Sequence, residues 1–140
     1  MLEGATIDSV GRAVDMGVIE LTGARGESVR IHVQCPFRIL GGGTVFLGSH
    51  DMRYPQRDAG PDAFDEFTTM YDKHAAALNT VLGQLRSRVS AVTFGRAGHL
   101  AVDGEQGLRL EAFPDCSGPV EAWRVLVRHG EHFGFPPDLI

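Results

Sequence analysis

The chain has 140 residues, a length typical of one domain around one hydrophobic core. Its net charge is −5 and its basic residues form no stripe, which argues against nucleic acid as a partner and favours a basic protein partner. No apolar run approaches the roughly 20 residues of a membrane span, and the N-terminus lacks the pattern of a signal peptide. We therefore expect a cytoplasmic protein with reduced thiols and no membrane contact.

The first third of the chain shows the pattern of β-strands separated by glycine-containing turns. Val29, Ile31 and Val33 alternate with polar residues, which places these three side chains on one face of a strand. The strands expected in this region cover residues 14–21, 29–33, 37–40 and 44–47.

A polar loop over residues 52–61 leads into the one helical pattern of the sequence. Asp62 can cap this helix, and Asp65 and Glu66 then lie in its first turn, where the helix dipole favours acidic side chains. The apolar residues that recur at helical spacing are Phe64, Phe67, Tyr71, Leu78, Val81, Leu82 and Leu85. This pattern predicts one long helix, with a helix in two pieces, divided before Tyr71, as the alternative.

The second half of the chain repeats features of the first half in the same order. Both halves contain Gly-Arg-Ala, at 11–13 and 95–97, then an alternating strand, then an aromatic–arginine pair. The pairs are Phe37-Arg38 and Trp123-Arg124. The strands expected here cover residues 89–94, 99–102, 108–113, 121–127 and 132–135. Either the halves form an internal structural repeat, or any two antiparallel meanders would look this similar.

These elements predict a single α+β domain over residues 1–140. We expect mainly antiparallel β structure, about eight or nine strands in two similar halves, with one long central helix. The half-repeats cover about 5–52 and 88–140, and the linking loop and helix cover about 53–87. An approximate two-fold axis would relate the halves, and the helix would cover one sheet face.

Several short motifs resemble a family of small uncharacterised bacterial proteins, most of them actinobacterial. That family carries H-x-Q-x-P-W-R, G-S-x-D and F-P-D-x-S-G followed by E-x-W-R, and Phe37 stands here where the family has Trp. The segments that carry the resemblance are 32–39, 48–52, 113–118, 121–124 and 132–133. The resemblance implies no activity, but small acidic α+β proteins of this class include immunity proteins, so an immunity-like role follows by analogy.

Histidine and cysteine patterns give no assembled catalytic or metal motif. Only His129 and His132 have the local spacing of metal ligands, so we predict no metal and no cofactor. Cys35 and Cys116 follow comparable strands, and no catalytic signature surrounds Cys35. We expect two inert thiols, with a disulfide between them as the alternative.

Charged and aromatic residues provide the candidates for binding. Arg38 and Arg124 either form a paired anion site or neutralise neighbouring acids. Trp123 is either a core anchor or an exposed anchor for a partner. Asp65 and Asp72 share a helical face if the helix is continuous, so the acids form either a solvated face or a docking surface for a basic partner.

We therefore predict a non-catalytic protein-binding domain, possibly immunity-protein-like, that uses an acidic helix surface. The candidate binding residues are Asp62, Asp65, Glu66, Asp72, Arg38, Arg124, His50 and Trp123. The alternative is a small-ligand-binding or enzymatic domain with a pocket between the halves, formed by Arg38, Arg124, His50 and Cys35. A further alternative to a monomer is a homodimer whose edge strands pair between copies.

Overall fold

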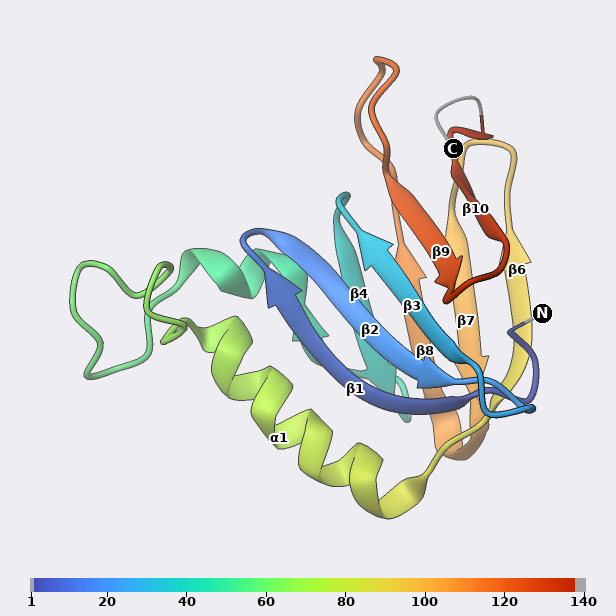
Figure 1. The fold of residues 1–140 in the computed structure, drawn as a ribbon. Coiled ribbons are helices and arrows are strands. Elements are labelled where there is room, and N and C mark those ends of the chain that lie inside the picture. The colour runs from blue at the N-terminus through green and yellow to red at the C-terminus, as the bar shows by residue number, and fades with distance from the viewer. Residues whose placement is uncertain (1, 138–140) are drawn as a thin grey trace.

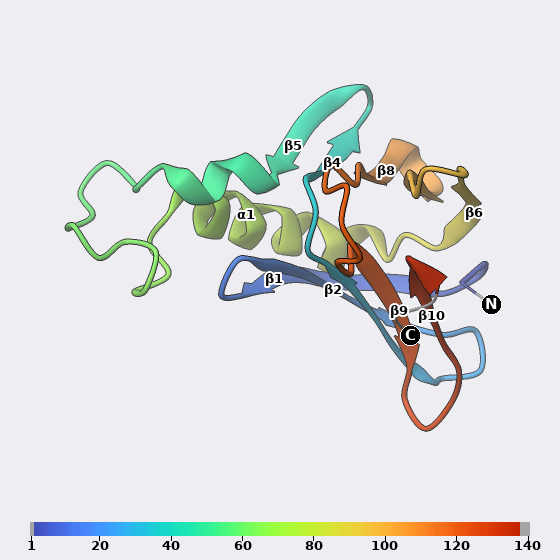
Figure 2. The ribbon, with the colours of Figure 1, turned by 90° about the horizontal axis from the view of Figure 1, so that it is seen from above.

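A computed structural model describes residues 2–137, and two five-stranded antiparallel sheets face each other in it (Figures 1 and 2). The strand order is β1-β2-β3-β9-β10 in the first sheet and β5-β4-β8-β7-β6 in the second. The single α-helix, α1, lies between the two layers along the side formed by β1 and β5, as Figure 2 shows. The predicted α+β class with two similar halves and one helix is confirmed.

The strands of the first half are β1 (Thr6–Ala13), β2 (Met16–Thr22), β3 (Ser28–Val33), β4 (Phe37–Gly41) and β5 (Thr44–Gly48). A 3-10 helix η1 (Ser49–Arg53) and the helix α1 (Met70–Leu85) follow. The second half contains β6 (Val89–Phe94), β7 (Leu100–Gly104), a 3-10 turn η2 (Glu105–Gly107), β8 (Leu108–Ala112), β9 (Trp123–Val127) and β10 (His132–Phe135).

The core lies between the sheets because each central strand turns alternate apolar residues inward. Val29, Ile31 and Val33 are buried as their alternation predicts. The buried stripe of α1 consists of Tyr71, Ala75, Leu78 and Leu82, and it closes the core at the side of β1 and β5. One continuous apolar cluster therefore includes both sheets and the helix.

Each half gives three strands to one sheet and its last two strands to the other. Strands β1 to β3 form one sheet with β9 and β10, and strands β6 to β8 form the other sheet with β4 and β5. The strand registers make the two sheets equivalent position by position: Phe37 lies opposite Ala112, and Trp123 lies opposite Val33. Arg38 and Arg124 therefore hold matching places, as the sequence comparison predicts.

One strand is missing from the predicted set. The structure has ten strands, not eight or nine, because residues 6–13 form β1 and residues 14–15 are a turn. Only Ile7 and Val10 are apolar side chains larger than alanine in β1, and a register shift between Ile7 and Ser9 disturbs the alternation. An edge strand with a bulge does not show the period of two that identifies strands in sequence.

The helix begins later than predicted. Its N-cap is Thr69, whose hydroxyl accepts a hydrogen bond from the Asp72 amide, so Asp62 does not cap it. Residues 62–67 form turns, and Phe67 adopts a left-handed conformation with φ of 58°, which no helix interior accommodates. The condition for Asp65 and Asp72 to share a helical face, a continuous helix from Asp62, is therefore not met.

The two Gly-Arg-Ala segments are not structural equivalents. Gly11, Arg12 and Ala13 lie within β1, whereas Gly95 to Ala97 lie in the turn after β6. The registers instead match Val10 with Val92 and Arg12 with Phe94, because Val10 faces Ile19 and Val92 faces Val102, its counterpart. The β6–β7 turn is longer than the β1–β2 turn, and this length difference displaces the motif.

In the described part of the chain, no helix has the length and apolar character needed to cross a membrane.

Candidate functional site

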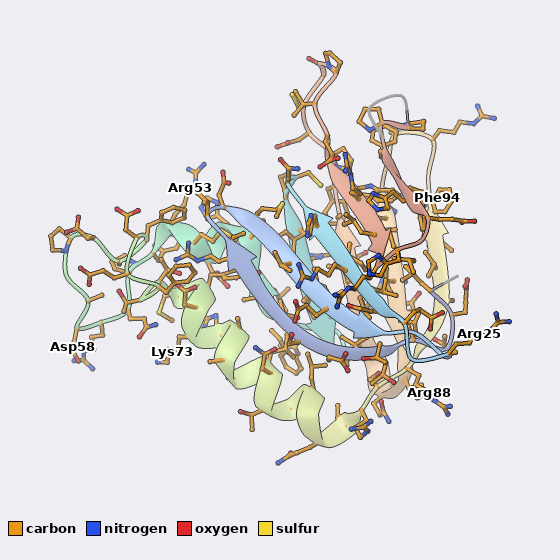
Figure 3. All side chains as sticks on the ribbon, viewed as in Figure 1. Arg25, Arg53, Asp58, Lys73, Arg88 and Phe94 are labelled. Carbon is orange, nitrogen blue, oxygen red and sulfur yellow. The ribbon has the colours of Figure 1, made fainter. Side chains whose placement is uncertain are left out.

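The segment of residues 54–68, here called the acidic loop, connects η1 to α1 and extends away from the sandwich (Figure 1). Figure 3 shows Asp58 at its far end. The loop contains one basic residue, Arg57, and four acidic residues, Asp58, Asp62, Asp65 and Glu66. All four acidic side chains are exposed or nearly so, and none is recorded in an ion pair with any residue that the structure describes.

Main-chain hydrogen bonds close the acidic loop at its base. The Gln56 amide donates to the Thr68 carbonyl at 2.8 Å, and the Met70 amide donates to the Tyr54 carbonyl at 2.7 Å. The Gln56 side-chain amide also donates to the Thr69 carbonyl at 3.0 Å. The two ends of the loop are thus held side by side, and the loop leaves the body of the protein as a defined structure.

Arg12 of β1 attaches the acidic loop to the first sheet. Its side chain is 1% exposed, and its Nε donates to Asp72 Oδ1 at 2.8 Å. Nη2 donates to Asp72 Oδ2 at 3.0 Å and to the Phe64 carbonyl at 2.6 Å. The guanidinium carbon lies 4.5 Å from the Phe64 ring centroid and 4.1 Å from that of Phe67. This one cation therefore links the first sheet, α1 and the loop.

Asp72 has a structural role. Besides Arg12, it accepts hydrogen bonds from the Thr69 amide and hydroxyl, which forms a capping box at the helix N-terminus. Burial opposes ionisation of Asp72, but the hydrogen bonds from Arg12 and Thr69 outweigh it and hold the pKa of Asp72 below its ordinary value. The predicted contribution of Asp72 to an acidic binding surface is wrong, because its carboxylate is already fully engaged.

Two large aromatic side chains are exposed on the same loop. Tyr54 and Phe67 are each 54% exposed. One face of the Phe67 ring rests on Arg12, which fixes the ring while its remaining surface meets solvent. Exposed aromatic residues are enriched in protein-binding surfaces, where such anchors lie within a polar rim.

A depression of about 630 Å³ lies next to the acidic loop. Phe64 of the loop, His50 and Arg53 of η1, and Cys35 and Gln34 after β3 contribute to its lining. It is wide and open, with similar shares of polar and apolar surface. A depression of this kind can receive a side chain of a partner that docks on the loop.

His50 and Cys35 are the two residues of the predicted pocket that the structure brings to one depression. His50 is exposed, and its Nε2 lies 3.5 Å from the Tyr54 hydroxyl. Burial raises the pKa of the Cys35 thiol to about 11, so it is a protonated, weak nucleophile at neutral pH. Cys35 and Cys116 are both free thiols, and both line a small neighbouring depression of about 50 Å³.

Arg38 and Arg124 do not converge on a common site. Arg38 lies on the outer face of the second sheet and donates to Glu111 at 2.8 Å. Arg124 lies on the outer face of the first sheet, with its Nη2 2.6 Å from Glu121 Oε1. Of the two roles considered for these arginines, the structure shows the neutralisation of neighbouring acids.

Glu121 links the segment before β9 to the residue that follows β3. The Gln34 side-chain amide donates to Glu121 Oε2 at 2.5 Å, and Glu121 Oε1 forms an ion pair with Arg124 Nη2. His32 lies directly opposite Arg124 across the strand pair β3–β9. Burial and, secondarily, the charge of Arg30 lower the pKa of His32. These residues connect the strand ends on the outer face of the first sheet.

Trp123 is a core residue. Its side chain is buried, its indole N–H donates to the Gly98 carbonyl at 2.7 Å, and its ring packs edge-on against Phe133. It cannot contact a partner, so the core alternative is the one that the structure shows. The space between the sheets is also filled: only about 30 Å³ remains free there, and its lining is almost wholly apolar. The pocket predicted from Arg38, Arg124, His50 and Cys35 does not form, because the two arginines lie on opposite outer faces and only His50 and Cys35 share a depression.

Sequence reasoning missed Arg12, Tyr54 and Phe67. In the sequence, Arg12 stands out only as part of a repeated tripeptide, and the spacing of Phe67 predicts a place in the buried stripe of the helix. One local signal points to Arg12: an arginine inside a strand requires an acidic or carbonyl partner if it is buried. Among the residues that the structure describes, no group of three or more His, Cys, Asp or Glu side chains is placed to hold a metal ion.

No family model matches the sequence. No curated protein and no solved structure matches it either. The resemblance to the bacterial family described above therefore stays a prediction.

Proposed function

We propose that this protein is a non-catalytic protein-binding domain that presents the acidic loop to a basic protein partner. The observation that carries the proposal is the combination, on one projecting loop, of four exposed carboxylates and two exposed aromatic rings, held in place by the buried Arg12. A loop that is already ordered loses little conformational entropy on binding. We therefore place the proposed acidic surface on the loop that precedes α1, whereas the sequence analysis places it on the helix.

Charge and shape support a protein as the partner. The loop and the whole chain are both negatively charged, which favours encounter with a basic surface. Tyr54 and Phe67 supply apolar contact area, and the adjoining depression of about 630 Å³ offers a place for a partner side chain. An immunity-type role, in which the protein neutralises a basic toxin, is the specific form of this proposal.

Charge reversal on the loop tests the proposal. Asp62→Lys, Asp65→Lys and Glu66→Lys are combined in one variant, and its capture of partners from cells that express the protein is compared with wild type by quantitative mass spectrometry. We expect capture to fall by roughly tenfold or more, because steering and rim contacts are both reversed. Raising the salt concentration should weaken wild-type capture in the same direction.

The matched control reverses three exposed acids outside the loop, Asp8, Asp115 and Glu131. It changes the net charge by the same amount and should leave capture intact. Tyr54→Ala, which alters no charge, should weaken capture of the same partner. Equal losses in the loop variant and the control would show that net charge alone drives binding, and would overturn the assignment of the loop.

A further inference from the structure

The two sheets have equivalent edge strands, β1 and β6, whose outward main-chain groups differ in their partners. At β1, the Val10 amide donates to the Asn79 side-chain oxygen at 2.8 Å, and the Asn79 side-chain amide donates to the Val10 carbonyl at 2.9 Å. Tyr71 of the same helix donates its hydroxyl to the Gly11 carbonyl at 2.6 Å. The helix α1 thus satisfies this edge as a neighbouring strand would.

At β6 only the first residue is covered: the Gly4 amide donates to the Val89 carbonyl, and the Val89 amide donates to the Ala5 carbonyl, both at 2.8 Å. The Gly95 amide donates to the His99 carbonyl, and because donors alternate along an antiparallel pair, the amides of Val92 and Phe94 point away from β7. No hydrogen bond to these two outward amides or to their carbonyls is recorded within residues 2–137. Val92 is the positional equivalent of Val10. The main-chain groups that α1 hydrogen-bonds at Val10 therefore have no such partner at Val92.

The side chains of β6 itself are uncharged, and one is strongly exposed. The strand β6 reads Val-Ser-Ala-Val-Thr-Phe, and Phe94 is 64% exposed. Phe94 borders a depression of about 270 Å³ that is also lined by Leu2, Val92, Phe133 and one charged residue, Glu3. Sheet edges are normally guarded by lysine, proline or a covering element, and the exposed part of β6 has none of these.

We propose that a second copy of this chain pairs with β6, antiparallel and about a two-fold axis. With Thr93 opposite Thr93 of the second copy, the outward amide and carbonyl of Val92 meet those of Phe94 in the other copy, and every unpaired group of both residues is satisfied. A neutral strand also avoids the repulsion that the net charge of −5 would cause elsewhere. Figure 3 shows Phe94 on the opposite side of the molecule from Asp58, so pairing leaves the acidic loops free.

The oligomeric state of the full chain tests this pairing. A short strand pair buries less than a standard interface of about 1,600 Å², so we expect a reversible dimer with a micromolar Kd in sedimentation velocity. Phe94→Asp should raise that Kd roughly tenfold or more. Val120→Asp adds the same charge at an exposed apolar residue in a distant loop and should not change it. A wild-type chain that stays monomeric through the micromolar range would overturn the proposal, as would a dimer unaffected by Phe94→Asp.

A backbone variant isolates the main-chain contribution. Val92→Pro removes an N–H that points away from β7, so it costs the monomer no ladder hydrogen bond but deletes a donor from the dimer. Circular dichroism and thermal unfolding confirm that the variant is folded, and it should then be monomeric at wild-type dimer concentrations. A folded Val92→Pro protein that dimerises as wild type would exclude pairing through this edge.

Disulfide trapping tests the register in a Cys116→Ser background. Thr93→Cys places two sulfurs opposite each other, where Cβ atoms of such pairs lie about 4.5–5.5 Å apart, so an oxidised covalent dimer should form. Ala91→Cys lies on the same face of β6, but its copies would be roughly 13 Å apart along the strands and should not crosslink. Crosslinking of Ala91→Cys in preference to Thr93→Cys would overturn the proposed register. Partner capture by the acidic loop is independent of all these variants.

Discussion

Val10 and Val92 occupy equivalent positions in two sheets of the same topology, but their surroundings differ. Val10 lies beneath α1, which bonds its outward amide and carbonyl through Asn79. Val92 lies at an edge that no helix covers. Only one linking segment, residues 49–88, separates the halves, so only one of the two equivalent edges can receive a helix from within the chain. The comparison shows that a repeated β topology leaves one edge open when its single helix closes the other.

The same contrast applies two residues further along each strand. Arg12 on β1 and Phe94 on β6 are positional equivalents. Arg12 is buried because α1 supplies Asp72 and the acidic loop supplies the Phe64 carbonyl. Phe94 has neither and remains largely exposed. The covered edge thus became the base of the candidate binding loop, and the open edge became a candidate for self-association.

Breaking the buried ion pair should give the largest effect on stability. Asp72→Asn leaves the Arg12 guanidinium buried without its counter-charge, and we expect a loss of about 3–5 kcal/mol in the free energy of unfolding, measured with urea at neutral pH. Arg88→Ala removes the exposed pair with Glu105 and should cost no more than about 1 kcal/mol. A loss in Asp72→Asn as small as that in Arg88→Ala would contradict the role given to Arg12.

Lowering the pH should reduce the difference in free energy of unfolding between wild type and Asp72→Asn. The pKa of Asp72 is lowered in the folded protein, so its stabilising contribution is complete above the ordinary carboxyl pKa of about 3.9 and is lost as pH falls through the lower folded value. The pKa of Glu111 is lowered too, but Glu111 is present in both proteins and its effect cancels in the comparison. The free energies of unfolding of the two proteins, measured at successively lower pH, should approach each other. A difference that stays constant with pH would contradict the link between the Asp72 pKa and stability.

Removing the helix contact to the edge of β1 should have an intermediate effect. Asn79→Ala deletes both hydrogen bonds to Val10 and leaves its amide and carbonyl unpaired under α1, at an expected cost of about 1–3 kcal/mol. Thr80→Ala is the control, since Thr80 faces solvent on the next helical position. In Asn79→Ala, the Val10 amide should also lose protection from hydrogen exchange.

The open edge should contribute least to the stability of the monomer. Phe94→Ala removes a ring that is 64% exposed, and we expect a change below about 1 kcal/mol at concentrations where the chain is monomeric. Under the same conditions the Val92 amide should exchange far faster than that of Val10 in wild type. Equal protection of the two amides would show that the edges are not different in the way the structure indicates.

The alternation of apolar residues predicted the central strands because burial on one face imposes a period of two. It did not predict β1, whose partner on one side is a helix and whose bulge disrupts the pattern. The apolar stripe predicted α1 from Tyr71 onward, where the residues face the core. It failed for Phe64 and Phe67, which lie over Arg12 in the loop and coincide with helical spacing by position alone.

The sequence predicts only part of the candidate site, because it shows local composition but not contacts between distant residues. The sequence predicts Asp62, Asp65 and Glu66 as binding residues because an excess of acidic residues is a local property of composition. The engagement of Asp72, the burial of Trp123 and the separation of Arg38 from Arg124 depend on which strands pair across the sandwich. Matching positions in the two halves lie on opposite outer faces, and no spacing in the chain shows this.

The amino-acid sequence by itself determined the α+β class, the two similar halves, the inward faces of most strands and the negative charge, because these follow from periodicity and composition over short distances. The exchange of the last two strands between the sheets, the start of the helix at Thr69, the burial of Arg12 and the uncovered edge of β6 were decided by the tertiary structure. Each of these depends on contacts between residues far apart in the chain, where the free energy of packing and of satisfying buried polar groups outweighs local preference.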